Sequence, residues 1–542
     1  MPFPFHLHTL ALLLFLGVTS ADNRQQGSKP GVWIPDNGDG TYTNPIIFAD
    51  YSDPDVIRVG DDYFLTSSSF SHFPGLPILH SKDLVSWKLI GHAVPRHPYE
   101  AFEQPQHGNG IWAPSLRYHN NEFYIFYGDP DYGIFMTKAV NPKGPWDPLV
   151  RVKEAKGWID PCPLWDDDGK AYLVHAWAKS RAGFNSVLTV NRMSRDGRTL
   201  LDSGVTVFDG RRSHPTIEGP KLYKRNGYYY VFAPAGGVKS GWQTVLRSKN
   251  ITGPYEGKIV LEQGSTDING PHQGAWVETQ TGESWFFHFQ DLDAYGRVLH
   301  LQPMRWSNGW PLIGEDFDKN GIGEPVRKHR KPIVGGNFPI EVPQTSDDFD
   351  SKKQGLQWQW QGNPNPAWIS LEGRNGWLRF FSQPSRAESL HLWNETSLLL
   401  QKFPAPEFSA TTKLEFLPET VGEKAGLIVF GLDYSYVGVE KKSDGLVLSH
   451  VICRDADKNR PEVTTTVSEV RGNAFYFRVT VRTGARCRFS YSTDGTSYQP
   501  IGKEFSARPG KWVGAKLGMF SLAPHGVFRS GYTDFDWIRI HP

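Results

Sequence analysis

One pattern recurs five times in the first two thirds of this chain of 542 residues. Each copy contains an alternating apolar run, a turn rich in Gly, Asn and Asp, and a second run rich in aromatic residues. The four clearest copies begin at Asp53, Ala113, Asp160 and Glu218, and a weaker copy begins at Gln273. The starts lie 47 to 60 residues apart. A repeat of this length with several strands per unit predicts a β-propeller.

Three of the five copies carry an acidic residue at the equivalent position: Asp53, Asp160 and Glu218. Equivalent positions of a radial repeat face one axis, so we expect the three carboxylates to meet. A single Asp-Pro pair is most often a turn device. A cluster of like charges, however, is destabilising unless one carboxyl group stays protonated. A protonated acid beside an ionised carboxylate is the pair that glycoside hydrolysis uses.

The length of the chain indicates two domains, and both are predicted to be all-β. The repeat region is rich in strand-forming residues and has no sustained helical periodicity. Beyond it, runs such as TTKLEFLP and DFDWIRI alternate strictly, which is typical of an antiparallel β-sandwich. The predicted order is a signal peptide (1–21), a leader (22–40), a five-bladed β-propeller that carries the catalytic residues (41–333), a linker (334–345) and a C-terminal β-sandwich (346–542).

Composition and charge exclude two classes of partner. Lys and Arg together number 58 and Asp and Glu 57, so no basic surface able to hold nucleic acid is expected. The apolar stretch 10–18 is too short to span a bilayer and predicts a secretory signal peptide. No other apolar run is long enough to cross a membrane. We therefore expect a secreted, extracellular protein, and the sequence indicates no oligomeric state.

Sequons and cysteines agree with secretion. Asn250 and Asn394 each begin an N-glycosylation sequon, which predicts a glycoprotein. The three cysteines lack the spacing of metal ligands. Cys453 and Cys487 lie in the same C-terminal region and could form one disulfide, whereas Cys162 is interpreted as a small buried residue.

The chain also resembles a known family along nearly the whole of the predicted mature protein. The resemblance rests on NPIIFADYSDPDVI, FPGLPILHSKDLVSW, GIWAPSLRY, WIDPCPLWDDDGKAYL, IEGPKLYKRNGYYY, GPHQGAWV and GRVLHLQPMRW. These motifs resemble glycoside hydrolase family 43, a family of five-bladed propellers that includes inverting β-xylosidases, α-L-arabinofuranosidases and arabinanases. The resemblance implies a hydrolase acting on xylan or arabinoxylan and needing no cofactor.

The resemblance implies a role for each of the three acids. Asp53 matches the general base that activates the attacking water. Glu218 matches the general acid that protonates the departing sugar oxygen. Asp160 matches the third carboxylate, which raises the pKa of the acid and helps to orient it. For an inverting enzyme, the base and the acid are expected roughly 6.5–9.5 Å apart, which leaves room for water.

Four further residues match positions around the sugar. Arg297 resembles the arginine that hydrogen-bonds hydroxyls of the terminal sugar, a role suited to its fixed fork of donors. Trp112 and Phe70 resemble aromatic residues that wall the pocket, although packing in the core would equally explain them. His272 resembles a histidine at the centre of the propeller that many relatives associate with a bound calcium ion and its waters. A lone histidine is usually a satisfied core residue.

The C-terminal region from residue 346 resembles the concanavalin-A-like domain of family-43 β-xylosidases. That domain packs against the propeller, and one of its loops can close the pocket; scaffolding alone would also explain it. A closed pocket would imply exo action, whereas an open cleft would imply endo action of the arabinanase type. Terminal β-D-xylose and α-L-arabinofuranose both stay open as substrates. The alternatives are a non-catalytic carbohydrate-binding protein on the same fold and a related five-bladed fold acting on fructans.

Overall fold

The structure is a computed structural model, and it describes residues 1–2, 31–386, 391–527 and 529–542. The predicted signal peptide and most of the predicted leader therefore lie outside the described residues. The regular secondary structure of the described chain is almost entirely strand, and none of its described helices is long and apolar enough to cross a membrane. Its short helices are α1 (Lys179–Ala182), η1 (Glu100–Glu103), η2 (Asp293–Tyr295), η3 (Pro366–Trp368), η4 (Leu392–Asn394) and η5 (Ala456–Lys458).

The N-terminal unit is a propeller of five four-stranded antiparallel sheets, as predicted. In every sheet the spatial order of the strands follows the chain. First strands of neighbouring blades contact one another, so they surround the axis. The blades are β2 (Asp55–Val59), β3 (Asp62–Thr66), β4 (Gly75–Ser81), β5 (Lys88–Val94); β6 (Pro114–His119), β7 (Glu122–Asp129), β8 (Gly133–Ala139), β9 (Val150–Glu154); β10 (Trp158–Trp165), β11 (Ala171–Trp177), β12 (Val187–Met193), β13 (Val205–Asp209); β14 (Lys221–Arg225), β15 (Tyr228–Ala235), β16 (Trp242–Ser248), β17 (Glu256–Leu261); and β18 (His272–Glu278), β19 (Ser284–Asp291), β20 (Arg297–Ser307), β21 (Trp310–Ile313).

The five sequence repeats coincide with the starts of the innermost strands. Asp53 lies two residues before β2, and Pro114 is the first residue of β6. Asp160 lies inside β10, Glu218 lies three residues before β14, and Gln273 is the second residue of β18. The repeat in the sequence therefore marks where each blade begins at the axis.

Apolar clusters between neighbouring blades form the core of the propeller. The ring of Phe64 in the first blade meets the ring of Phe123 in the second at 5.1 Å. Trp87 of the first blade meets Phe287 of the fifth at 5.8 Å, edge to face. Such aromatic pairs contribute about 0.5–1.5 kcal/mol beyond the burial of their surface. Large apolar residues along the strands give each blade apolar side chains that pack against the neighbouring blades.

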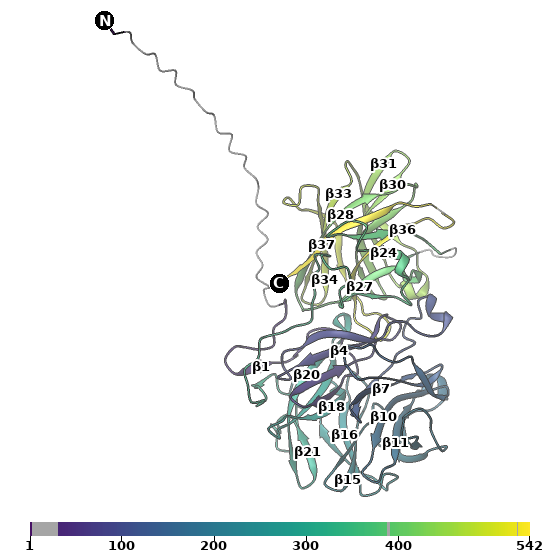
Figure 1. Cartoon of the computed structure of the whole chain (residues 1–542), viewed down its shortest axis with the longest axis vertical. Coiled ribbons are helices and arrows are strands. Elements are labelled where there is room, and N and C mark those ends of the chain that lie inside the picture. Colours follow the sequence, from purple (N-terminus) through teal and green to yellow (C-terminus); the bar gives the residue numbers. More distant parts are fainter. Residues whose placement is uncertain (3–30, 387–390, 528) are drawn as a thin grey trace.

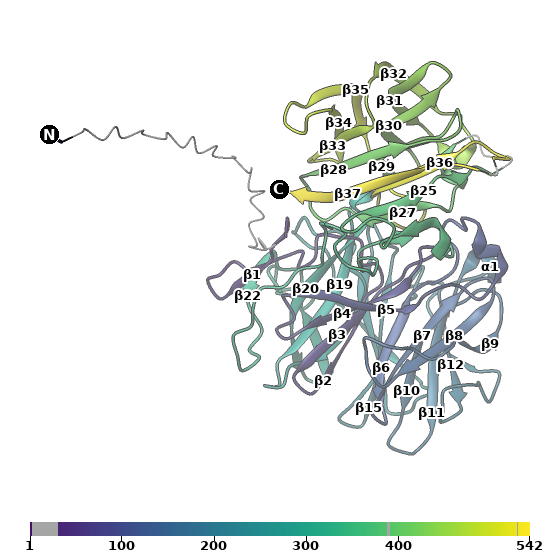
Figure 2. The same ribbon diagram turned by 45° about the horizontal axis from the view of Figure 1, so that its top comes forward.

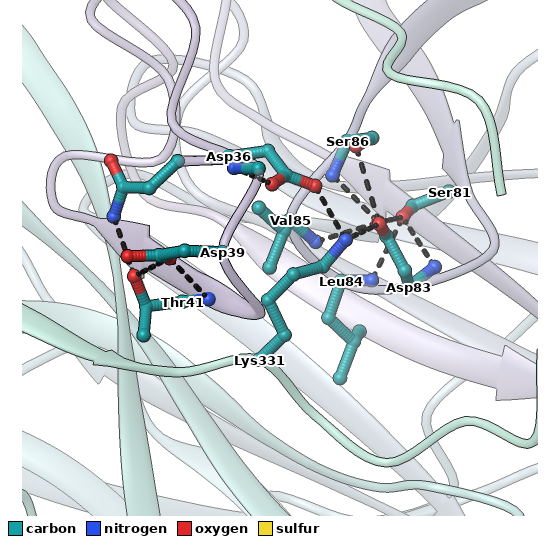
Figure 3. A network of polar contacts seen from close by, with 11 residues as sticks. Asp36, Asp39, Thr41, Ser81, Asp83, Leu84, Val85, Ser86 and Lys331 are labelled. Carbon is teal, nitrogen blue, oxygen red and sulfur yellow. Dashed lines mark hydrogen bonds and ion pairs between the residues drawn. The ribbon is translucent and has the colours of Figure 1, made fainter. Parts of the chain in front are cut away.

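The ring is closed by a short sheet and by one lysine. Strand β1 (Thr41–Thr43) precedes the first blade and pairs with β22 (Lys328–Arg330), which follows the last. Figure 3 shows Lys331 between two carboxylates, with its Nζ 2.5 Å from Asp36 and 3.0 Å from Asp83. Asp83 belongs to the first blade, so Lys331 links the beginning and the end of the propeller.

The C-terminal unit is a sandwich of an eight-stranded and a seven-stranded sheet, whose pairs are antiparallel except for β26 with β36. Figures 1 and 2 show it stacked on the propeller. The first sheet contains β23 (Gln359–Trp360), β27 (Leu398–Lys402), β36 (Lys516–Ala523), β29 (Lys424–Phe430), β30 (Tyr434–Lys442), β31 (Gly445–Cys453), β32 (Val463–Val470) and β26 (Gln383–Pro384); the second contains β24 (Ile369–Ser370), β25 (Leu378–Phe381), β37 (Tyr532–His541), β28 (Phe408–Leu417), β33 (Ala474–Arg482), β34 (Arg486–Ser492) and β35 (Gln499–Ser506).

The disulfide considered for Cys453 and Cys487 does not form in this structure. Both residues are buried free thiols. Cys453 belongs to β31 of the eight-stranded sheet, and Cys487 to β34 of the seven-stranded sheet. Proximity in the sequence does not place the two cysteines in one sheet, because the chain changes sheets between them. Cys162 is also buried and free, as its interpretation as a small packed residue expects.

Backbone hydrogen bonds join the two units. Phe73 of the propeller and Trp360 of the sandwich exchange N–H···O bonds of 3.1 and 2.7 Å. Ala515 donates its N–H to the carbonyl of Ala294 at 2.7 Å. Tyr295 of the propeller is packed into the core of the sandwich. The bond from Ala515, which directly precedes β36, holds the end of that segment against the propeller.

Candidate active site

The backbone places two of the predicted carboxylates in a strained conformation. Asp53 and Asp160 both have a φ of 55°, in the left-handed region that non-glycine residues rarely adopt. Asp160 also lies at an irregularity in the pairing of β10 with β11. Conformations of this kind cost about 1–3 kcal/mol each and occur mainly where function requires them. Glycine serves the same need beside the third acid, because Gly219 has a φ of 58°.

Asp53 is almost completely buried, and its carboxylate is surrounded by donors. Ser52 donates its hydroxyl to Oδ2 at 2.8 Å, and Ser68 donates its hydroxyl to the same oxygen. Arg297 donates from Nη1 to Oδ1 at 3.2 Å. Three donors compensate for the loss of water around a negative charge. The group is therefore well placed to accept a proton from a bound water.

Asp160 lies nearby and interacts with the backbone that follows Glu218. Its Oδ2 accepts hydrogen bonds from the N–H of Gly219 at 2.8 Å and from the amide of Gln273 at 3.4 Å. Burial and, second to it, the negative charge of Asp53 raise the pKa of Asp160 to about 7, against the opposing effect of the Gly219 N–H. Asp160 therefore interacts electrostatically with both other acids: the charge of Asp53 acts on Asp160, and the charge of Asp160 acts on Glu218.

Glu218 favours its protonated form more strongly than Asp160 does. Burial and, after it, the negative charges of Asp160 and Asp53 together raise its pKa to about 8. The side chain still keeps 28% of its surface exposed, so the carboxyl group is open to a substrate. His272 Nε2 lies 3.6 Å from Oε1 of Glu218, and burial lowers the pKa of this histidine to about 3. A neutral His272 gives no positive charge to offset the acids.

Arg297 joins the same cluster from the first position of β20. Its Nη1 donates to the hydroxyl of Ser52 at 2.8 Å as well as to Asp53. Its guanidinium carbon lies 4.8 Å from the ring centre of Phe289. Its backbone N–H donates to Asp50 at 2.9 Å. The structure thus places Arg297 beside the carboxylates, with its donors fixed and directed into the site.

Trp112 and Phe70 form one side of the site. Their ring centres lie 6.3 Å apart in an edge-to-face arrangement. Phe70 is buried, and its backbone exchanges hydrogen bonds of 2.8 and 3.0 Å with Ile111. The indole N–H of Trp112 donates to the carbonyl of Gly108 at 2.9 Å. The structure therefore brings both predicted aromatic residues together, although Phe70 offers little surface to a ligand.

Trp512 of the sandwich completes this wall, and sequence reasoning missed it. It lies in the segment between β35 and β36, is 49% exposed and has a φ of 67°. Its ring centre lies 6.3 Å from that of Trp112 and 5.8 Å from the guanidinium carbon of Arg297. An exposed tryptophan held in a strained conformation beside an arginine indicates a ligand-binding role. Its sequence context is GKWVG. Nothing in these residues indicates that Trp512 lies beside Trp112, which is 400 residues earlier in the chain.

The residues around His272 do not fit a calcium ion held by protein ligands. Calcium takes six to eight oxygen ligands. Within the described residues, no group of three His, Cys, Asp or Glu side chains is placed to hold a metal. Both ring nitrogens of His272 are buried, and neither has a hydrogen-bond partner among the described residues, so the ring suits hydrogen bonding to water. We assign the ion no part in the chemistry below.

The arrangement supports hydrolysis by paired carboxyl groups. Asp53 is hydrogen-bonded only as an acceptor, and Glu218 favours its protonated form at neutral pH. A base and an acid that differ in this way can act in one step, the first on water and the second on a leaving oxygen. Arg297, Trp112 and Trp512 supply donors and flat apolar surface beside them.

Two family models match the chain. "Glycosyl hydrolases family 43" matches residues 42–311. "Beta xylosidase C-terminal Concanavalin A-like domain" matches residues 346–541. Together they span both units of the structure.

Individual proteins show the same similarity along most of their length. The chain is 44% identical to a protein of Xylanibacter ruminicola that is provisionally named a beta-xylosidase, over 89% of this chain and 86% of the other. It is 29% identical to a non-reducing end alpha-L-arabinofuranosidase of Bacteroides ovatus, over 92% and 94%. The crystal structure of a xylan beta-1,4-xylosidase from Bacillus halodurans matches with a TM-score of 0.82 at 27% identity, covering 92% of this chain and 100% of that one.

Proposed function

Because the chain belongs to glycoside hydrolase family 43, we propose that this glycoside hydrolase removes single pentose units from the non-reducing ends of xylan and arabinoxylan chains. The observation that carries the proposal is the position of Trp512. This residue of the sandwich lies against Trp112 and beside Arg297, so one side of the site is covered. A covered site accommodates the end of a chain more readily than its middle.

The three acids support hydrolysis with inversion. Asp53 accepts a proton from water as the water oxygen attacks the anomeric carbon. The bond between that carbon and the leaving oxygen breaks, and Glu218 transfers its proton to the leaving oxygen. Asp160 acts on Glu218 through its charge and through the Gly219 N–H. The single displacement inverts the configuration at the anomeric carbon.

Binding of the terminal sugar is assigned to the remaining residues. Arg297 already donates to Asp53 and Ser52, so its other donors can pair with neighbouring hydroxyls of a pentose. Trp112 and Trp512 offer ring surface to the apolar faces of the sugar. Phe70 supports Trp112 from behind.

β-D-Xylose is the sugar we propose first. The relative with 44% identity is provisionally named a beta-xylosidase, and the solved xylan beta-1,4-xylosidase aligns over its whole length. α-L-Arabinofuranose is the second candidate, since a relative with 29% identity is named for that activity. The two sugars differ little in their pattern of hydroxyls, so a few side chains of the site can decide between them.

The decisive experiment compares p-nitrophenyl β-D-xyloside, p-nitrophenyl α-L-arabinofuranoside, xylobiose and arabinoxylan, with identification of products. We expect free xylose from the first and third substrates, and loss of turnover by several orders of magnitude in Glu218→Gln. Residual activity of this variant should be greater on p-nitrophenyl xyloside than on xylobiose, because nitrophenolate leaves with little need of a proton. Release of only long oligosaccharides would contradict exo action. A chain that binds xylan but cleaves none of these substrates would be a carbohydrate-binding protein.

We also propose that the protein is secreted and glycosylated. The apolar stretch 10–18 supports secretion, and Asn250 lies exposed in the turn between β16 and β17. Expression in a eukaryotic secretory host, followed by mass determination before and after deglycosylation, tests both points. Retention of the protein inside the cells would contradict secretion.

A further inference from the structure

A small cavity lies behind the aromatic wall of the site, between the two units. It is lined by His72, His107 and Gly108 from the propeller and by Lys511, Gly514 and Lys516, among others, from the sandwich. Its volume is about 10 Å³. That volume is close to the minimum that one water molecule needs, so the cavity can hold a single small species.

The lining of this cavity is basic and has unused donors. Lys516 is only 2% exposed, and no hydrogen bond or ion pair of its ammonium group is found within the described part of the chain. His72 is 5% exposed, and its Nδ1 has no hydrogen-bond partner among the residues that the structure describes. None of the described residues that line the cavity is acidic. Burying an ammonium group without a counterion is strongly unfavourable.

The charged groups around Lys516 do not supply that counterion. Lys402 lies opposite Lys516 on the paired strand β27 and adds a second positive charge. Asp50 is the only acid found to act on Lys516 among the described residues, but its two oxygens already accept the N–H groups of Arg297 and Gly514 at 2.9 Å each. Burial, and then Lys402, lower the pKa of Lys516 to about 7. His107 donates its Nε2–H to the carbonyl of Trp393, 2.9 Å away, and so supplies no negative charge either.

We propose that this cavity binds one small inorganic anion, with chloride as the physiological occupant, held by the ammonium group of Lys516 and the Nδ1–H tautomer of His72. A cavity of this size favours a monatomic anion over sulfate, phosphate or a carboxylate. An anion between these donors neutralises the charge of Lys516 and satisfies the free ring nitrogen of His72. Because the anion favours the charged form of Lys516, its affinity should fall as the pH rises.

Occupancy of this site would stabilise the wall of the sugar pocket. His72 follows Phe70 by two residues, and Gly108 accepts the hydrogen bond from the indole of Trp112. Trp512 lies between Lys511 and Val513, both of which line the cavity. All three segments that carry the aromatic residues therefore line the cavity that the anion would occupy. Binding of the anion does not depend on the proposed function; only the kinetic consequence does.

The direct test uses crystals of the whole chain equilibrated with bromide, which scatters anomalously and replaces chloride. We expect an anomalous peak in contact with Nζ of Lys516 and with the ring of His72. Density of a water alone, with no anomalous signal at saturating bromide, would overturn the proposal. This measurement uses the natural sequence, so it stands even if a variant of the buried lysine fails to fold.

A second test measures thermal unfolding in potassium chloride and in potassium gluconate at equal ionic strength, at about pH 6, which lies below the pKa of about 7 of Lys516 and so keeps its ammonium group mostly charged. Chloride should raise Tm saturably in the natural protein, because a ligand bound only by the folded state stabilises it. The effect should vanish in Lys516→Met and persist in the matched control Lys503→Met, whose side chain is exposed. An equal response in Lys516→Met would contradict the assignment.

The kinetic consequence is read from KM for p-nitrophenyl β-D-xyloside. Coupling between two sites commonly changes affinity by about fivefold or more, so we expect KM to fall by that factor in chloride, with little change in kcat. A chloride effect on Tm without an effect on KM would keep the anion site and remove its link to the sugar pocket. If the chain hydrolysed no pentoside, the bromide and Tm results would still decide the anion site.

Discussion

At the scale of single residues, the site divides three acids by their surroundings. Asp53 has three side-chain donors around it, whereas no hydrogen bond to the Glu218 carboxyl group is found among the described residues and a neutral histidine lies 3.6 Å away. Asp160 is intermediate in its hydrogen bonding, because its carboxyl group accepts one backbone N–H at 2.8 Å. The same chemical group therefore acquires different protonation preferences within one site. This division is what an acid–base pair requires.

The first prediction concerns the alkaline limb of kcat/KM. This limb reports loss of the proton from the general acid of the free enzyme, so it should have an apparent pKa near the value of about 8 of Glu218. Asp160→Asn removes a negative neighbour, which makes ionisation of Glu218 easier. The limb should therefore move to lower pH. A purely structural role of Asp160 would lower activity without moving the limb, and that result would contradict its assignment.

The second prediction concerns stability. The pKa of Glu218 is raised in the folded state, so the folded protein holds a proton that the unfolded chain loses above a pKa near 4.5. Stability should consequently fall as the pH rises from about 4.5 to about 8. Glu218→Gln removes this penalty, so its Tm should exceed that of the natural protein at neutral and alkaline pH and equal it near pH 4, below the pKa near 4.5 of the unfolded chain.

The matched control for this comparison is Glu372→Gln in the sandwich, whose side chain is 71% exposed. This exchange should leave the pH dependence of Tm unchanged. A lower Tm of Glu218→Gln than of the natural protein at neutral pH would show that the carboxyl group does not resist ionisation.

At the scale of elements, the sequence repeat predicted the beginnings of the innermost strands because each copy combines a turn with an alternating apolar run. Asp53, Asp160 and Glu218 were found in this way, since equivalent positions face one axis. Trp512 was not found, because its position depends on how a loop of the sandwich meets the propeller. Contacts such as that of Ala515 with Ala294 fix the loop, and no local pattern encodes them. Asp50, which joins Arg297 to Gly514, was missed for the same reason.

The third prediction tests this loop. Trp512→Ala should lower kcat/KM by about tenfold, equivalent to about 1.4 kcal/mol, mainly by raising KM. The fold should persist, because the side chain is half exposed. Trp512→Phe should recover much of the loss, since an aromatic ring is retained. Phe317→Ala, which truncates an exposed aromatic residue in the segment after β21, is the matched control and should behave as the natural protein. Equal kinetics of Trp512→Ala and this control would remove Trp512 from the site.

At the scale of the whole molecule, the length and the repeats were sufficient to predict a propeller followed by a sandwich. The sequence could not predict how the two units dock. The hydrogen bonds that Phe73 and Trp360 exchange join segments that are distant in the sequence. No local sequence pattern could predict that Lys331 closes the ring, because its partners Asp36 and Asp83 lie about 250 to 300 residues earlier. These long-range contacts hold the blades, and hence the acids, at fixed separations.

The fourth prediction tests the central claim that acids from separate blades act on opposite sides of one glycosidic bond. Proton NMR should follow the hydrolysis of p-nitrophenyl β-D-xyloside or xylobiose from the first turnovers, before mutarotation equalises the anomers. The account predicts that α-xylose appears first, because a single displacement by water held at Asp53 inverts the anomeric carbon. First appearance of β-xylose would require a covalent intermediate and would contradict the assignment of Asp53 as the base.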